Sequence, residues 1–255
     1  MHARTSQGRA RRWWLPCLLC AAVLACDDGT PMPAESDDEG SEPPAWPLPR
    51  ECVAPEGLGR PASIEQVVAL VNALPKPTTL PCVLESLDRP LQLYASTSTA
   101  GAQPADGPDS PRIFLFEGPL AMSVVPRGTG SETLELSSAI GDRLSIKAEL
   151  LFPVDEMLAD SAPYDQVDLG EGSTCGTCHG SETRVDTIDF ADAWASDMYQ
   201  DEPEQALSLS FLRQSALDCN RQDDPQRCEM LDALFGHGDV VPGDLARDSL
   251  VCRAL

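Results

Sequence analysis

The spacing of apolar residues changes partway along the chain, from a helical to an alternating pattern. Ser63 and Gln66 form a helix-capping sequence. The apolar residues that follow recur on one helical face: Ile64, Val67, Val68, Val71 and Leu74. Pro75 and Pro77 come next, and proline cannot continue a helix because it has no backbone N–H. The pattern therefore predicts an amphipathic helix at the start of the folded region.

After this helix, apolar and polar residues alternate as they do in strands. Between residues 143 and 152, four apolar side chains alternate with Ser145, Lys147 and Glu149. This pattern predicts a strand with one buried face and one face in water. Six strands are predicted by such runs, at residues 80–87, 91–95, 112–117, 120–125, 132–138 and 143–152, and residues 184–190 are a further candidate.

Two helices are predicted near the end of the chain. The first covers about residues 207–219, and the second follows Asp224 as N-cap, with Pro225 at its first position and Gly236 just past its end. Together these elements indicate an α+β fold, with an antiparallel β-sheet or sandwich, one N-terminal helix and two C-terminal helices. We expect residues 51–255 to form a single β-rich domain.

The first 25 residues have the composition of a secretory signal. Four arginines precede an apolar run at residues 15–25, which is too short to span a membrane. The run ends in Val23-Leu24-Ala25-Cys26, which resembles the lipobox of bacterial lipoproteins. The resemblance implies that residues 1–25 are a signal peptide and that Cys26 carries lipid, anchoring the chain at the bacterial cell envelope. The alternative is ordinary cleavage, with Cys26 a plain thiol.

Residues 26–50 are rich in acidic residues and proline, so we expect a disordered tether. Loss of residues 1–25 would remove four of 18 basic residues and no acidic ones, leaving 14 against 41 and a net charge of 14 − 41 = −27. So acidic a chain repels nucleic acid. The expected partners are the membrane, through the lipid, and a redox partner protein that could use the acidic surface.

Cysteine usage indicates an oxidising compartment. A disulfide between Cys219 and Cys228 is predicted, because the two residues lie close together where the late helices meet. Cys52 could pair with Cys82 or with Cys252, and the sequence does not decide between them.

The most specific chemical signal is the run Cys175-Gly176-Thr177-Cys178-His179. It resembles the haem-attachment site of c-type cytochromes, over these five positions only. The resemblance implies a covalent haem c, joined to Cys175 and Cys178 and ligated by His179. A small cytochrome c has a helix running into this motif, whereas here Pro163 and glycines precede it, so we expect a haem site on a β-rich domain.

Three other interpretations compete for the same residues. Cys175 and Cys178 could form a structural disulfide in a non-catalytic surface or interaction lipoprotein. A zinc site would need two further ligands, and the chain has no second Cys-x-x-Cys. A thioredoxin-like pair would need a preceding strand and a following helix, but here a glycine-rich acidic loop precedes the motif.

A haem bound through His179 would need a second axial ligand to be low-spin. His237, in Gly236-His237-Gly238, is the candidate because the glycines allow close approach to a flat ring. Met198 competes for this role, whereas Met230 sits among apolar residues and is expected in the core. With few histidines and no Gly-x-Ser-x-Gly sequence, we expect an electron carrier rather than an enzyme.

Overall fold

The computed structural model describes residues 46–141, 143–200, 203–243 and 245. The predicted signal peptide, the lipidation residue Cys26, most of the tether and Cys252 lie outside the described residues. The predicted fold class, α+β with a mainly antiparallel sheet, is confirmed. None of the helices in the described part of the chain is both long and apolar enough to cross a membrane.

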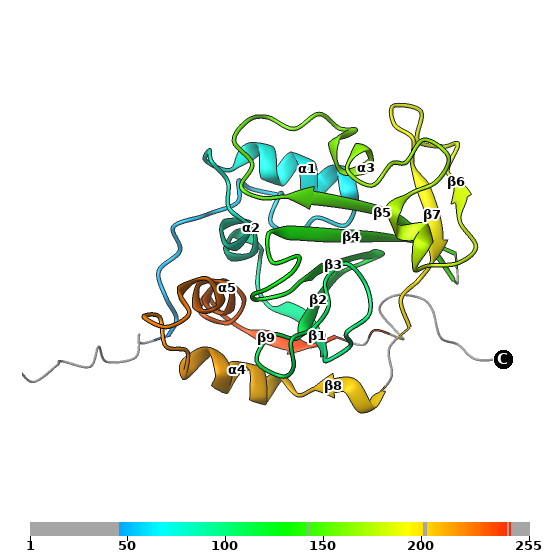
Figure 1. The fold of residues 1–255 in the computed structure, drawn as a ribbon. Coiled ribbons are helices and arrows are strands. Elements are labelled where there is room, and N and C mark those ends of the chain that lie inside the picture. Colours follow the sequence, from blue (N-terminus) through cyan, green and yellow to red (C-terminus); the bar gives the residue numbers. More distant parts are fainter. Residues whose placement is uncertain (1–45, 142, 201–202, 244, 246–255) are drawn as a thin grey trace, which may run out of the picture. The chain divides into compact units, whose positions relative to one another are not determined.

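One nine-stranded sheet forms the centre of the domain (Figure 1). Eight strands follow the order β6-β7-β5-β4-β3-β2-β1-β8 and pair antiparallel, while β9 pairs parallel with β1. The strands are β1 (Leu91–Ser96), β2 (Arg112–Glu117), β3 (Leu120–Val124), β4 (Thr133–Ile140), β5 (Leu144–Leu151), β6 (Thr183–Arg184), β7 (Trp194–Asp197), β8 (Ala206–Leu207) and β9 (Val240–Pro242). Because β5 and β7 are neighbours in the sheet, the chain between them leaves the sheet and returns beside its starting point.

In the described residues, five α-helices accompany the sheet: α1 (Ile64–Ala73), α2 (Leu80–Ser86), α3 (Ala162–Asp165), α4 (Leu209–Leu217) and α5 (Pro225–Phe235). One of the two hydrogen bonds expected from the capping sequence of α1 is present: the Ser63 hydroxyl accepts from the Gln66 N–H. The Gln66 side chain accepts from the Ala62 N–H instead of returning to Ser63. Asp224 caps α5, and Pro225 opens that helix.

The prediction of a strand at residues 80–87 is wrong, because this segment is α2. Its apolar residues Leu80, Val83, Leu84 and Leu87 recur three and four positions apart, which is the spacing of one helix face, and all four are buried. The Thr79 hydroxyl accepts from the Cys82 N–H, and Pro81 lies in the first turn, where its missing N–H costs no helical hydrogen bond. These contacts in the first turn favour a helix over a strand.

The candidate strand at residues 184–190 is also much shorter than predicted. Only Thr183 and Arg184 pair with the sheet, as β6. The chain then turns, with the Ile188 N–H donating to the Val185 carbonyl.

One face of the sheet carries the main hydrophobic core. Apolar side chains of β1 to β5 pack there against residues from α1, α2, α4 and α5. We call this the helix-covered face. Its residues on β4 and β5, such as Leu134, Leu136, Ala148 and Leu150, are the apolar half of the predicted alternation.

The opposite face, which we call the polar face, was predicted to lie in water, and this prediction is wrong. Ser145 and Lys147 of β5 are 1% and 5% exposed. The Cys-x-x-Cys-His part of the segment between β5 and β7, together with Met198 and Tyr199, lies over this face and reduces its contact with solvent. Alternating apolar and polar residues show that the two faces of a strand differ in polarity. They do not show whether other parts of the chain cover the polar face.

Two disulfides stabilise the helical side of the domain. The predicted Cys219–Cys228 bridge is present and joins the end of α4 to α5. Cys52 pairs with Cys82 of α2. Residues 46–50, which were assigned to the tether, lie against the domain: Trp46 packs on the core, and the Leu48 N–H donates to the Gly236 carbonyl at 2.7 Å.

Candidate functional site

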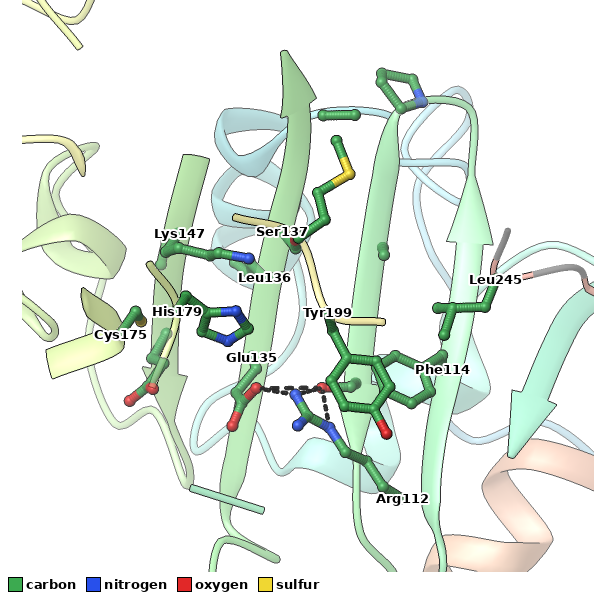
Figure 2. Close-up of a pocket in the computed structure, with 17 residues that line it drawn as sticks. Arg112, Phe114, Glu135, Leu136, Ser137, Lys147, Cys175, His179, Tyr199 and Leu245 are labelled. Atoms are coloured by element: carbon green, nitrogen blue, oxygen red, sulfur yellow. Dashed lines mark hydrogen bonds and ion pairs between the residues drawn. The ribbon is translucent and has the colours of Figure 1, made fainter. Parts of the chain in front are cut away.

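A cavity lies on the polar face of the sheet, beneath the Cys-x-x-Cys-His turn (Figure 2). Its floor is formed by side chains that stand next to one another on neighbouring strands. The register places Phe114, Ser123, Glu135 and Glu149 in one row across β2, β3, β4 and β5. Ala121, Ser137 and Lys147 form the next row. Cys175, His179, Met198, Tyr199 and Leu245 close the cavity from above.

The Cys-x-x-Cys-His sequence forms a single helical turn. A short 3-10 helix covers Thr174–Thr177, and the Ser173 hydroxyl caps it by accepting from the Gly176 N–H at 3.3 Å. The N–H groups of Cys178 and His179 both donate to the Cys175 carbonyl, at 3.1 and 2.9 Å. This turn brings Cys175 and His179 to the same cavity, whereas Cys178 is exposed.

Glu182 holds this turn in place. Its carboxylate accepts from the Ser173 hydroxyl at 2.6 Å and from the Ser173 N–H at 3.0 Å. The same carboxylate lies so close to Gly176 that a Cβ there would come within 2.5 Å of it. Glycine between the two cysteines is therefore required for the carboxylate to reach Ser173.

Neither cysteine of the turn is in a disulfide. Cys175 and Cys178 are free thiols, while the other four cysteines in the described residues are bridged. The alternative interpretation, a Cys175–Cys178 disulfide, is thus not what the structure contains, because the turn directs one thiol into the cavity and leaves the other at the surface. Burial, together with the nearby carboxylates Glu149 and Glu135, raises the pKa of the Cys175 thiol to about 11.

His179 is neutral at physiological pH. Burial lowers its pKa to about 4, and the positive charges of Lys147 and Arg112 act in the same direction. A neutral imidazole has a nitrogen lone pair free for a metal, so His179 can serve as a ligand. The raised pKa of Cys175 and the lowered pKa of His179 make the pair a poor nucleophile and base, which argues against cysteine hydrolase chemistry.

Arg112 is the centre of a buried hydrogen-bond network. Its guanidinium forms an ion pair with Glu135 and donates to the Ser123 hydroxyl at 3.1 Å. It also lies over the ring of Phe114, 4.9 Å from the centroid. Ser123 in turn donates to the Gln103 side chain at 2.9 Å. The charge of Arg112 is thus satisfied within the protein.

The charges of Glu149 and Lys147 are less well compensated by opposite charges than the charge of Arg112. Burial and the neighbouring charge of Glu135, directly opposite on β4, raise the pKa of Glu149 to about 7. Burial lowers the pKa of Lys147 to about 8. The sequence places both residues on the face predicted to be in water, so no local pattern distinguishes them from ordinary surface charges.

The predicted haem ligands do not all meet. His237 lines a different cavity, beside Leu48, Glu85 and Arg221, and its Nδ1 lies 3.3 Å from the Leu48 carbonyl oxygen. The structure does not bring it together with His179. Met198, the competing ligand, lines the same cavity as His179 and is 6% exposed. Met230 is buried in the main core, as expected.

The donor groups of the turn are two thiols and one imidazole. Two unbridged thiols at Cys-x-x-Cys spacing and an adjacent neutral imidazole are the groups that covalent haem attachment uses. In the described part of the chain, no three His, Cys, Asp or Glu side chains are grouped so as to hold a metal ion. Comparison with protein-family models, with curated proteins and with solved structures found no match to this chain.

Proposed function

We propose that this chain is an envelope lipoprotein that carries one covalently attached c-type haem and transfers electrons. The observation that carries the proposal is the chemical state of one helical turn. Cys175 and Cys178 are unbridged although the other described cysteines form disulfides, and the adjacent His179 is neutral. Thioether formation consumes free thiols, and iron ligation needs an unprotonated imidazole.

The residues of the turn and of the cavity can be assigned roles on this basis. Cys175, in the cavity, and Cys178, exposed on the same turn, would hold the haem. His179 would be its proximal ligand, and Met198 is the second axial candidate because it lines the same cavity. A bound haem supplies one-electron transfer. The apolar side chains Phe114 and Leu245 line part of the cavity wall.

The remaining parts of the proposal concern location and partners. Cys26 would carry the lipid that anchors the chain to the membrane, on the periplasmic or cell-surface side of the envelope. The acidic chain, with 41 acidic and 18 basic residues, offers a negative surface to a basic redox partner protein. These assignments follow from the sequence.

The experiment that tests the function is an absorption spectrum of the chain expressed together with a haem-maturation system. We expect a Soret band that remains with the protein after denaturation, because thioether bonds survive unfolding. Cys175→Ser/Cys178→Ser should lose the band, whereas the control Arg184→Gln, at an exposed position beyond the turn, should retain it. A wild-type chain without covalent haem would refute the proposal and favour the interaction lipoprotein.

The same spectra identify the second axial ligand. Met198→Ala should convert a low-spin haem spectrum to a high-spin one, because it removes the candidate ligand from the cavity of His179. His237→Ala should leave the spectrum unchanged, because His237 lines the other cavity. The reverse result would assign the ligand to His237.

A further inference from the structure

The side chain of Lys147 is largely buried, but its ammonium nitrogen faces a cavity. Lys147 is 5% exposed as a residue, and its nitrogen is not among the fully buried unpaired atoms of the described residues, so it keeps some contact with solvent. It extends from β5 over the polar face beside His179, into the cavity beneath the Cys-x-x-Cys-His turn (Figure 2). An ammonium group at the inner wall of a narrow cavity is poorly solvated, so an anion that enters the cavity would be stabilised by pairing with it.

The acidic groups nearest to Lys147 do not supply that anion. Glu135, on the neighbouring strand, is already paired with Arg112. Glu149 lies two residues further along β5, and its raised pKa leaves it partly protonated near neutral pH. Cys175 and Asp197 also act on Lys147 electrostatically, but neither forms an ion pair with it.

The rest of the cavity is suited to an apolar group. Phe114, Tyr199 and Leu245 line it on the side away from Lys147 (Figure 2). The cavity volume is about 50 Å³, enough for a few water molecules or a short slender ligand. Among the charged residues that line it, Arg112 and Glu135 pair with each other, which leaves Lys147 available to an entering anion.

We propose that Lys147 is the anion-binding residue of this cavity and that its ligand is a carboxylate attached to an apolar body. Two sources have this chemistry: a propionate of the haem in the proposed function, or the head group of a separate small carboxylic acid. The anion site does not itself depend on haem, because Lys147 belongs to the sheet and not to the Cys-x-x-Cys-His turn.

Binding of hexanoate and hexanol to the haem-free Cys175→Ser/Cys178→Ser chain, measured by calorimetry, tests the anion site. The two probes share an apolar tail and differ in charge. We expect hexanoate to bind at least ten-fold more tightly than hexanol, because only the carboxylate pairs with Lys147. Equal affinity, or no binding of hexanoate, would overturn the proposal without any Lys147 variant.

Two lysine variants then test whether Lys147 is the cation that binds the carboxylate. The chain has two lysines, and the ammonium of the other, Lys76, already donates to the Val71 carbonyl at 2.8 Å. Lys147→Met should reduce the affinity for hexanoate to that for hexanol, whereas Lys76→Met should leave it unchanged. Equal effects of the two variants would show that Lys147 is not the anion-binding residue.

The haem-loaded wild-type chain distinguishes the two sources of the carboxylate. Loss of hexanoate binding on loading would assign a haem propionate to Lys147, whereas unchanged binding would assign a separate carboxylic acid. If the chain takes up no covalent haem, the proposed function is refuted. The binding of hexanoate and hexanol to the haem-free chain would still show whether Lys147 binds an anion.

Discussion

The two faces of the sheet differ in the side chains that they bury. The helix-covered face is apolar, and α1, α2, α4 and α5 pack on it to form the main core. The polar face is largely covered as well, but it carries Arg112, Glu135, Lys147 and Glu149 beneath the short 3-10 turn at Thr174–Thr177. Both disulfides of the described residues lie on the helical side, and both free thiols lie over the polar face.

This contrast separates stability from chemistry within one sheet. Apolar burial favours folding directly, whereas buried charges lower stability unless each one is paired. Perturbed pKa values cluster on the polar face, where Cys175, His179, Glu149 and Lys147 share one cavity. Such clustering is typical of functional sites.

The largest expected effect comes from breaking the buried ion pair on the polar face. Arg112→Met should lower the free energy of unfolding by about 3–5 kcal/mol, because the half-buried carboxylate of Glu135 would lose its ion-pair partner while it lies opposite Glu149. Arg112→Met/Glu135→Leu should recover most of this loss, since neither charge is then left alone. Denaturant unfolding of the three chains checks the prediction, and a double variant no more stable than the single one would contradict it.

The helix-covered face should respond through packing alone. Leu134→Ala, at a fully buried position of β4, should cost about 2–5 kcal/mol of unfolding free energy because it leaves a cavity in the core. Leu151→Ala is the control on the neighbouring strand: Leu151 is 50% exposed, and its loss should cost no more than about 0.5 kcal/mol. The same unfolding measurement applies, and equal costs would show that the core does not lie where the burial places it.

The smallest expected effect is a pH dependence that belongs to the polar face. The pKa of Glu149 is raised from 4.5 to about 7 on folding, so the native protein holds a proton that the unfolded chain releases. This group therefore stabilises the fold below about pH 4.5, and the contribution is lost as pH rises through 7. Wild type should lose about 1–3 kcal/mol relative to Glu149→Gln between pH 5 and pH 8.

The difference in unfolding free energy between wild type and Glu149→Gln reports the titration of Glu149 without that of His179. Because the pKa of His179 is lowered to about 4, its contribution has the opposite sign and is lost as pH falls below about 6.5. That contribution is present in both chains and cancels in the comparison. Glu156→Gln, at an exposed site, is the matched control, and a pH-independent difference for Glu149→Gln would contradict the prediction.

Much of the sheet could be predicted from local patterns. Strands β1 to β5, except for their ends, follow from alternation, and α5 begins at Asp224 and Pro225 because both residues satisfy helix-start requirements locally. The strand predicted at residues 80–87 was a misinterpretation, since apolar residues three and four positions apart match one face of a helix rather than a strand.

The site was only half predictable, for a different reason. Cys175, Cys178 and His179 are adjacent in sequence, so their motif is visible. Arg112, Glu135 and Lys147 come from three strands, and their convergence depends on the register of the sheet and on a loop that folds over it. No single stretch of sequence contains that information. His237 looked suitable because of its glycine neighbours, but it lies beside Leu48.

The pairing of β5 with β7 has a consequence for how this domain can evolve. The segment carrying the Cys-x-x-Cys-His turn begins and ends at adjacent strands, and the turn is held mainly by its own contacts between Ser173 and Glu182. Substitutions at an exposed position of the turn, such as Cys178, therefore change few contacts of the sheet. New binding chemistry could arise there by mutation or insertion while selection on the framework continues to preserve its register.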